Sequence, residues 1–184
     1  PRKRATEMTI AEPVKITRFI SEVLEQLEIP YFIVGSLASS FHGIPRATAD
    51  VDLIADIKQE HVSRLSLELK QEFYVDGDRI HEAVLDRSSF NIIHLETMFK
   101  IDVFVLKDDP LSKIEMERRE KHQVSEEGGQ ALYLASAEDI ILSKLQWYQS
   151  EGCVSDRQWA DVQGVLRVSS DHLDFEYLLH TAEK

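Results

Sequence analysis

Residues 31–57, YFIVGSLASSFHGIPRATADVDLIADI, hold an apolar segment, a Gly-Ser pair and an Asp-x-Asp pair within a short span. The segment YFIVG is rich in β-branched and aromatic residues and ends at a glycine, which predicts a buried strand over 31–35. From Asp50 onward acidic and apolar residues alternate, so we expect a second strand over 50–56 with Asp50 and Asp52 on one face. The fold must therefore hold two carboxylates side by side on a strand that follows a glycine turn.

The rest of the chain, on both sides of this stretch, also carries patterns typical of strands and helices. Apolar periodicity predicts helices over 14–29, 36–43, 58–73 and 78–88, and two further strands over 89–95 and 100–105. A hairpin is expected around Gly128-Gly129, and Ser136 is placed to cap the first of three closing helices. Because strands give way to helices near residue 135, we expect a core over 1–135 and a C-terminal helical segment over 136–184 that packs on it.

The composition is that of a globular domain, with 43% apolar and 29% charged residues in a chain of 184. This length can bury a hydrophobic core without disulfides or a structural metal. The single cysteine, Cys153, excludes an internal disulfide and fits a reducing cytoplasm. No apolar run approaches the roughly 18 residues of a membrane span, and no signal-peptide pattern is visible, so we expect a cytoplasmic protein without membrane contact.

The charge of the chain limits its choice of partners. There are 33 acidic residues against 21 basic ones, which gives a formal net charge of −12. A surface this acidic repels the phosphate backbone of nucleic acids unless positive charges gather in one place. Binding of long duplex nucleic acid is therefore not expected.

The residue types in and after the first stretch suggest phosphate and metal binding. A glycine after a buried strand permits a tight turn, and a serine at the start of the next helix offers a hydroxyl and free N–H groups to an anion, so Gly35 and Ser36 are predicted to bind a triphosphate. Asp50 and Asp52, roughly 6 to 7 Å apart at Cα, suit chelation of divalent cations. Asp102 interrupts the apolar strand KIDVFVL, where a charge is costly unless a cation meets it. Three converging carboxylates meet the requirement of two magnesium ions about 4 Å apart.

Taken together, these motifs resemble those of the DNA polymerase β-type nucleotidyltransferase superfamily. The form R-x-T-x-D-hydrophobic-D-L, with the later EDIILSKLQWY and SDRQWADV, is most similar to its abortive-infection toxin-like (AbiEii-like) branch and related bacterial nucleotidyltransferases. The resemblance covers roughly residues 13–168. It implies an α+β nucleotidyltransferase fold with a mixed, curved sheet, helices mainly on one face and additional C-terminal helices. It also implies magnesium-dependent transfer of a nucleoside monophosphate from a nucleoside triphosphate to a hydroxyl acceptor.

The resemblance assigns roles to the residues of the two central motifs. Asp50 and Asp52 match the metal-binding pair. Asp102 matches the third carboxylate, which also binds metal and would help to deprotonate the acceptor. Gly35 and Ser36 match the triphosphate contact.

Residues outside the two central motifs match the superfamily less completely. Lys144 matches a helix lysine that meets the nucleotide, and Asp156 and Asp161 match acidic positions of the later helix motif. Ser155 stands where that motif usually has a lysine, so a cation near the phosphates or the acceptor would be missing. Arg46, from its place beside the acidic pair, is expected to contact a phosphate or the acids themselves.

Simpler interpretations of the same residues remain open. Asp102 could form a structural ion pair with Lys100 or Arg46, and Arg46 could lie in a solvated loop. Lys144 could be a surface lysine on an amphipathic helix. Asp-x-Asp could be two solvated acids on an edge strand.

The aromatic and imidazole side chains indicate no site of their own. The seven histidines show no ligand spacing, and we expect His42 in a loop near the site. Trp147 and Trp159 stand at helical positions and are expected to anchor the core or an interface.

Three classes of function compete on this evidence from the sequence. The first is an active nucleotidyltransferase that takes a nucleoside triphosphate and transfers to a small molecule, a protein side chain or a tRNA end, as the toxin-like part of a toxin-antitoxin pair with an antitoxin partner. The alternative is a catalytically decayed nucleotide-binding or protein-interaction module on the same fold. A dinucleotide-dependent oxidoreductase is disfavoured, because no G-x-G-x-x-G follows a strand.

Overall fold

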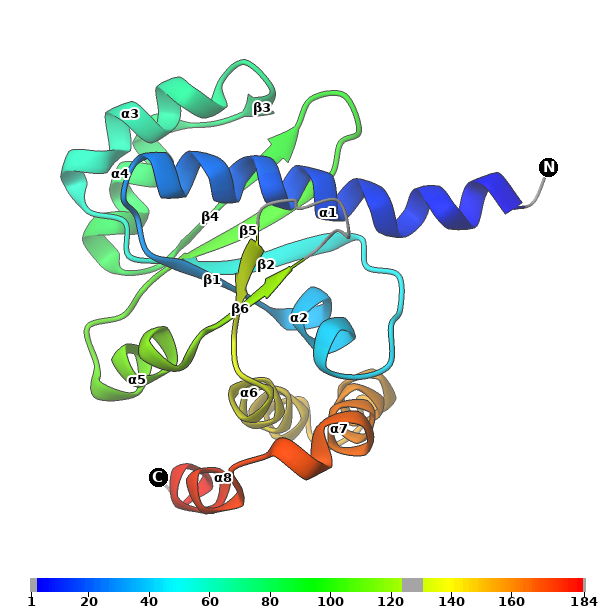
Figure 1. Ribbon diagram of the computed structural model, residues 1–184. Helices are drawn as coiled ribbons and strands as arrows, with labels where there is room; N and C mark the ends of the chain where they lie inside the picture. Colours follow the sequence, from blue (N-terminus) through cyan, green and yellow to red (C-terminus); the bar gives the residue numbers. More distant parts are fainter. Residues whose placement is uncertain (1–2, 124–130, 184) are drawn as a thin grey trace.

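The computed structural model describes residues 3–123 and 131–183. Its described residues form one sheet of seven strands in the order β3-β4-β5-β2-β1-β7-β6 (Figure 1). The strands are β1 (Tyr31–Val34), β2 (Asp50–Ala55), β3 (Phe73–Tyr74), β4 (Ser89–His94), β5 (Lys100–Val105), β6 (Glu120–Gln123) and β7 (Ala131–Leu134).

The centre of the sheet brings the predicted carboxylates onto neighbouring strands. β2 runs parallel to β5 and antiparallel to β1, so that Asp52 stands opposite Asp102 on one side and Val34 on the other. Residues opposite each other in a ladder project from the same face, and neighbouring strands lie about 4.8 Å apart. The same register places Asp50 opposite Lys100.

Helices cover both faces of this mixed sheet (Figure 1). On one face α1 packs its buried apolar side against α3 and β2, and α4 packs against α3 and β4. On the other face α2 contacts β1, β2, α6 and α7. The helices are α1 (Lys3–Gln26), α2 (Gly35–His42), α3 (Gln59–Leu69), α4 (Gly77–Asp86), α5 (Pro110–Arg118), α6 (Ala137–Ser150), α7 (Asp156–Ser169) and α8 (Phe175–Ala182), with a 3-10 turn at Ser170–His172.

The predicted α+β class and mixed sheet are confirmed, and the four predicted strands are present. α1 begins at Lys3, before the predicted start at Val14, and continues through Pro13. The short strand β3 and the helix α5 had no distinct sequence signal. β6 and β7 pair antiparallel as a hairpin would, but the expected Gly128-Gly129 turn lies outside the described residues.

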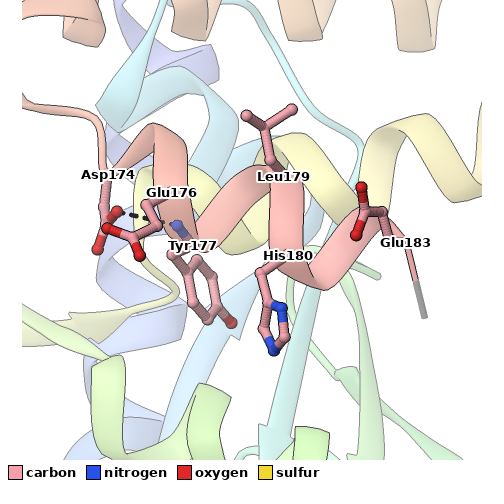
Figure 2. A pocket seen from close by; sticks show the side chains of 6 residues that line it. All are labelled: Asp174, Glu176, Tyr177, Leu179, His180 and Glu183. Atoms are coloured by element: carbon pink, nitrogen blue, oxygen red, sulfur yellow. Dashed lines mark hydrogen bonds between the residues drawn. The ribbon is translucent and has the colours of Figure 1, made fainter.

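The Tyr177 side chain is one of the attachments of the last helix, whose Leu178 also packs against the core. Tyr177 and His180 point to one side of α8 and Leu179 to the other (Figure 2). The Tyr177 hydroxyl donates to Asp139 Oδ1 at 2.7 Å, and the Arg118 guanidinium lies 3.8 Å from the centroid of its ring. α8 is thereby tied to α5 and α6.

Among residues 3–123 and 131–183, no helix combines the length and apolar character that a membrane span requires.

Candidate active site

Three carboxylates share one face of the central strands. Burial raises the pKa of Asp52, and the negative charges of Asp50 and Asp102 raise it further. Lys144 and Lys100 oppose this shift without cancelling it. A carboxylate whose ionised form is disfavoured by two neighbouring acids gains from a nearby cation. The electrostatics of the cluster thus suit a divalent metal ion.

Asp102 has partners within the protein as well. Lys100 Nζ lies 2.7 Å from Asp102 Oδ2, and the Asn91 side-chain amide donates to Asp102 Oδ1. The simpler interpretation of Asp102 as an ion-pair partner of Lys100 therefore describes a real contact. Lys100 is exposed and Asp102 is half-buried, and an ion pair at the surface contributes little to stability.

Gly35 connects the carboxylates to the start of α2. Its φ of +65° lies in the left-handed region, and a Cβ built on it would stand 2.1 Å from Asp52 Oδ2. No other residue type fits here without moving the carboxylate, because L side chains are disfavoured at this φ and the space is already occupied. The glycine is therefore required by the close approach of α2 to Asp52.

Ser36 lies beside Gly35 at the first turn of α2 and is only 6% exposed. Its hydroxyl oxygen accepts a hydrogen bond from Arg46 Nη2 at 2.6 Å and a longer one from Arg157 Nη2 at 3.3 Å. Two guanidinium groups thus converge on the N-terminus of α2, where free backbone N–H groups already favour an anion. We call Gly35, Ser36, Arg46 and Arg157 the phosphate seat.

Arg46 is held in place by Asp161 of α7. Arg46 Nε and Nη2 donate to the two carboxylate oxygens of Asp161 at 2.8 and 2.9 Å, a bidentate pair. Lys144 Nζ of α6 lies 3.0 Å from Asp161 Oδ2. Burial would raise the pKa of Asp161, but the hydrogen bonds from Arg46 and Lys144 outweigh it and hold the pKa below its ordinary value. One carboxylate thus positions two cations from different elements.

Several sequence expectations for this region need correction. Arg46 is not a solvated loop residue but a partner of Ser36 and Asp161. Lys144 is 6% exposed and so is not a surface lysine. His42 is a buried residue at the end of α2 rather than a loop residue. Trp147 and Trp159 are 56% and 44% exposed, so of their two expected roles the core anchor is wrong and the interface anchor stays a prediction.

The two acidic residues of the later helix motif have different surroundings. Asp161 contacts Arg46 and Lys144, whereas Asp156 is exposed at the first residue of α7. Arg157, two residues after Ser155, donates a hydrogen bond to the Ser36 hydroxyl oxygen. The motif SDRQWADV contained this arginine, but only the packing of α7 against α2 brings it to the phosphate seat.

A pocket of about 390 Å³ continues the carboxylate face of the sheet. Its floor includes Ile54 and Phe104, which follow Asp52 and Asp102 by two residues and therefore project from the same face. Trp147 of α6 and Glu115 of α5 line it further. The lining does not include Asp50, Asp52 or Asp102, so the pocket lies further along this face of the sheet than the acids do.

The carboxyl group of Glu115 in this pocket predicts how the stability of the folded chain depends on pH. Burial, with smaller contributions from Asp139 and Asp109, raises the pKa of Glu115 to about 7 from its ordinary 4.5. Between these values the folded chain holds a proton that the unfolded chain releases, so stability falls as pH rises through this window. Glu115→Gln removes the titration and is expected to raise Tm at pH 8 but not at pH 4. Thermal unfolding at both pH values measures this.

The exposed neighbour on the same helix provides the control for that measurement. Glu117→Gln should leave the difference in Tm between pH 4 and pH 8 as in the unsubstituted chain. If Glu115→Gln behaves like Glu117→Gln, the Glu115 carboxyl has no raised pKa.

Comparisons with solved structures agree with this architecture. The chain resembles an antigenic nucleotidyltransferase-like protein from Paracoccidioides brasiliensis, with 19% identity and a TM-score of 0.57 over 85% of this chain and 75% of that one. It resembles ANT(2'')-Ia in complex with adenylyl-2''-tobramycin, with 13% identity and a TM-score of 0.60 over 92% and 94% of the two chains. It also resembles the lincosamide antibiotic adenylyltransferase LnuA, lincomycin-bound, with 14% identity and a TM-score of 0.50 over 82% and 94%.

These likenesses concern three-dimensional structure. No protein-family model and no curated protein sequence matches the chain. At identities below 20%, agreement over most of both chains establishes the arrangement of strands and helices. The chain therefore has the nucleotidyltransferase fold.

Proposed function

We propose that the protein is a magnesium-dependent nucleotidyltransferase that moves a nucleoside monophosphate from a nucleoside triphosphate to a hydroxyl acceptor. The observation that carries this proposal is the contact between Gly35 and Asp52, which joins a cationic helix N-terminus to a carboxylate cluster. A triphosphate needs the cationic helix N-terminus, and the metal ion that accompanies it needs the carboxylate cluster. One small region of the chain holds both.

The donor set of the site fits magnesium. Asp50, Asp52 and Asp102 offer only carboxylate oxygens, which hard divalent cations prefer. Burial raises the pKa of Asp52 and the charges of Asp50 and Asp102 raise it further, and such an ion would relieve the repulsion between the three acids. When bound, two Mg²⁺ ions would neutralise the acids and the triphosphate and stabilise the leaving pyrophosphate.

The chain's own residues account for binding and proton transfer. Ser36 and the N–H groups at the start of α2 would receive phosphate oxygens, while Arg46 and Arg157 supply positive charge to them. Lys144 would meet the nucleotide from α6. Asp102, after exchange of its contact with Lys100, would take the proton of the acceptor hydroxyl.

Transfer can be tested without knowing the acceptor. The protein is incubated with each labelled nucleoside triphosphate, magnesium and a bacterial lysate, and the label is sought in RNA, protein and small molecules. Label in one class that depends on magnesium and on Asp52 supports the proposal. Magnesium–ATP binding in calorimetry without transfer to any class would instead favour the catalytically decayed module.

The identity of the acceptor is a second part of the proposal. The resemblance to the AbiEii-like branch supports a toxin-like role with an antitoxin partner, and transfer to a small molecule, a protein side chain or a tRNA end. The net charge of −12 favours the first two, because an acidic surface repels RNA except at a local cationic patch. The lysate experiment separates the three.

Metal binding at the acids predicts a change in thermal stability. Mg²⁺ that binds only the folded chain raises Tm in proportion to the logarithm of its concentration above Kd. We expect this rise in the unsubstituted protein and its loss in Asp52→Asn. In chelator, Asp52→Asn should be at least as stable as the unsubstituted protein, because it removes a charge that its neighbours disfavour.

The control variant for the thermal titration is Asp56→Asn. Asp56 lies just beyond the end of β2 and pairs with Lys58 and Arg87 instead of with the acids. It should retain the magnesium-dependent rise in Tm. An equal rise in Asp52→Asn would exclude Asp52 as a metal ligand.

A further inference from the structure

A second group of potential metal ligands lies at the opposite end of α2 from the phosphate seat. His42 is the last residue of α2, and Glu120 and His122 are on the edge strand β6. One ligand atom from each of the three residues lies within 4.8 Å of the others. No spacing of residues along the chain indicated this group, because His42 is far from the other two in the sequence.

The backbone arranges these side chains toward one another. Glu120 and His122 are two residues apart on a strand, so both project from the same face. The imidazole rings of His42 and His122 lie 5.2 Å apart at an interplanar angle of 88°, with the edge of one facing the other. His122 Nε2 is 3.0 Å from Glu120 Oε2. The carboxylate and this ring nitrogen thus already lie within hydrogen-bond distance of each other.

His42 is oriented as ligating histidines usually are. Its Nε2 lies 2.8 Å from the carbonyl oxygen of Ala135, the residue after β7. A carbonyl only accepts, so in the neutral imidazole this contact assigns the proton to Nε2 and leaves Nδ1 as the nitrogen that can ligate. Metal-bound histidines commonly donate their second N–H to a backbone carbonyl in this way.

We propose that His42, Glu120 and His122 form a binding site for a transition-metal dication of the zinc class, separate from the magnesium-binding acids. Two imidazoles and one carboxylate suit zinc, whereas magnesium prefers oxygen ligands alone. Zinc bonds of about 2.1 Å in a tetrahedron hold ligand atoms about 3.4 Å apart. Rotation of the exposed Glu120 and half-buried His122 side chains closes the remaining gap.

The fourth coordination position has space beside it. A pocket of about 310 Å³ is lined by His42 and Glu120, together with Glu138 and His172 from α6 and the 3-10 turn. Water from this pocket can complete the coordination, whereas both carboxylate oxygens of Glu138 already accept hydrogen bonds from Arg118 and from the Asp174 N–H. The ion would join β6, at the edge of the sheet, to the helix whose other end forms the phosphate seat.

Calorimetry with zinc chloride tests the site on the full chain, with excess magnesium present to occupy the carboxylates. We expect one equivalent of zinc and, for His122→Ala, an affinity at least about tenfold weaker, the loss that even indirect changes at metal sites produce. Glu120→Gln should weaken binding as well. Glu120 and His122 are on the exposed strand β6. The test therefore uses these two residues and leaves the buried His42 in place.

Two control variants distinguish this site from other positions. His81→Ala removes an exposed histidine elsewhere, and Asp52→Asn removes a proposed magnesium ligand; both should bind zinc as the unsubstituted chain does. Cobalt(II) should give the visible absorption of a tetrahedral ion, absent in His122→Ala. Unchanged zinc affinity in His122→Ala, or loss of zinc binding in Asp52→Asn, overturns the proposal.

Discussion

Asp102→Asn is expected to reduce nucleotidyl transfer by at least about a hundredfold while much of the magnesium–ATP affinity remains. The reason is the difference between the three acids. Asp50 and Asp52 lie next to the phosphate seat and are proposed to hold the metal of the triphosphate, whereas Asp102 is proposed to assist removal of the acceptor proton. Asp52→Asn is therefore expected to lose ATP binding itself in magnesium. ATP affinity and turnover, measured side by side for both variants, check this.

The control for this pair is again Asp56→Asn, which removes an aspartate close to β2 but outside the acid cluster. It should keep both ATP binding and turnover. Turnover of Asp102→Asn at the unsubstituted rate would mean that this residue serves only its ion pair with Lys100.

Gly35→Val is expected to abolish measurable binding of magnesium–ATP, and Ser36→Ala to weaken it by about tenfold, or about 1.4 kcal/mol. A valine Cβ would meet Asp52 Oδ2 at 2.1 Å, and its branched side chain would also be strained at a φ of +65°. The clash displaces a proposed metal ligand and the start of α2 together. The serine substitution removes only one hydroxyl and leaves the backbone N–H groups in place.

Gly152→Val is the control that distinguishes backbone strain from the clash with Asp52 as the cause of lost ATP binding in Gly35→Val. Gly152 has a φ of +77°, so a valine there is strained in the same way, but nothing lies within 4 Å of its Cβ position. Far-ultraviolet circular dichroism on all three variants verifies that they fold. Normal ATP affinity in folded Gly35→Val would refute the role of Gly35 and Ser36 in binding the triphosphate.

The strands and most helices were predictable from the sequence because their signals are local. β2 illustrates this: its alternation of acid and apolar residues fixes which side chains share a face, whatever the neighbouring strand is. α6 likewise begins where Ser136 was expected to cap it, and the Ser136 hydroxyl oxygen accepts from the Asp139 N–H at 3.2 Å. β3 was not predicted, since two residues carry no periodicity.

The candidate acids and the Gly-Ser pair could be identified for a similar reason. Asp50, Asp52, Gly35 and Ser36 occur within one short stretch, and their spacing already limits their geometry. Asp102 needed one further step, the expectation that its strand joins the same sheet. The structure confirms that β5 lies beside β2 and gives the register that places Asp102 opposite Asp52.

The sequence alone thus determined four of the strands, which face of β2 carries the acids, and where a glycine turn begins α2. Only the tertiary structure decided the surroundings: Asp161 bridging Arg46 and Lys144, Arg157 reaching Ser36, and His42 meeting β6. The physical reason is the range of the interactions involved. Periodicity and caps depend on residues a few positions apart, whereas these contacts join helices and strands that are distant along the chain and meet only when their apolar faces pack.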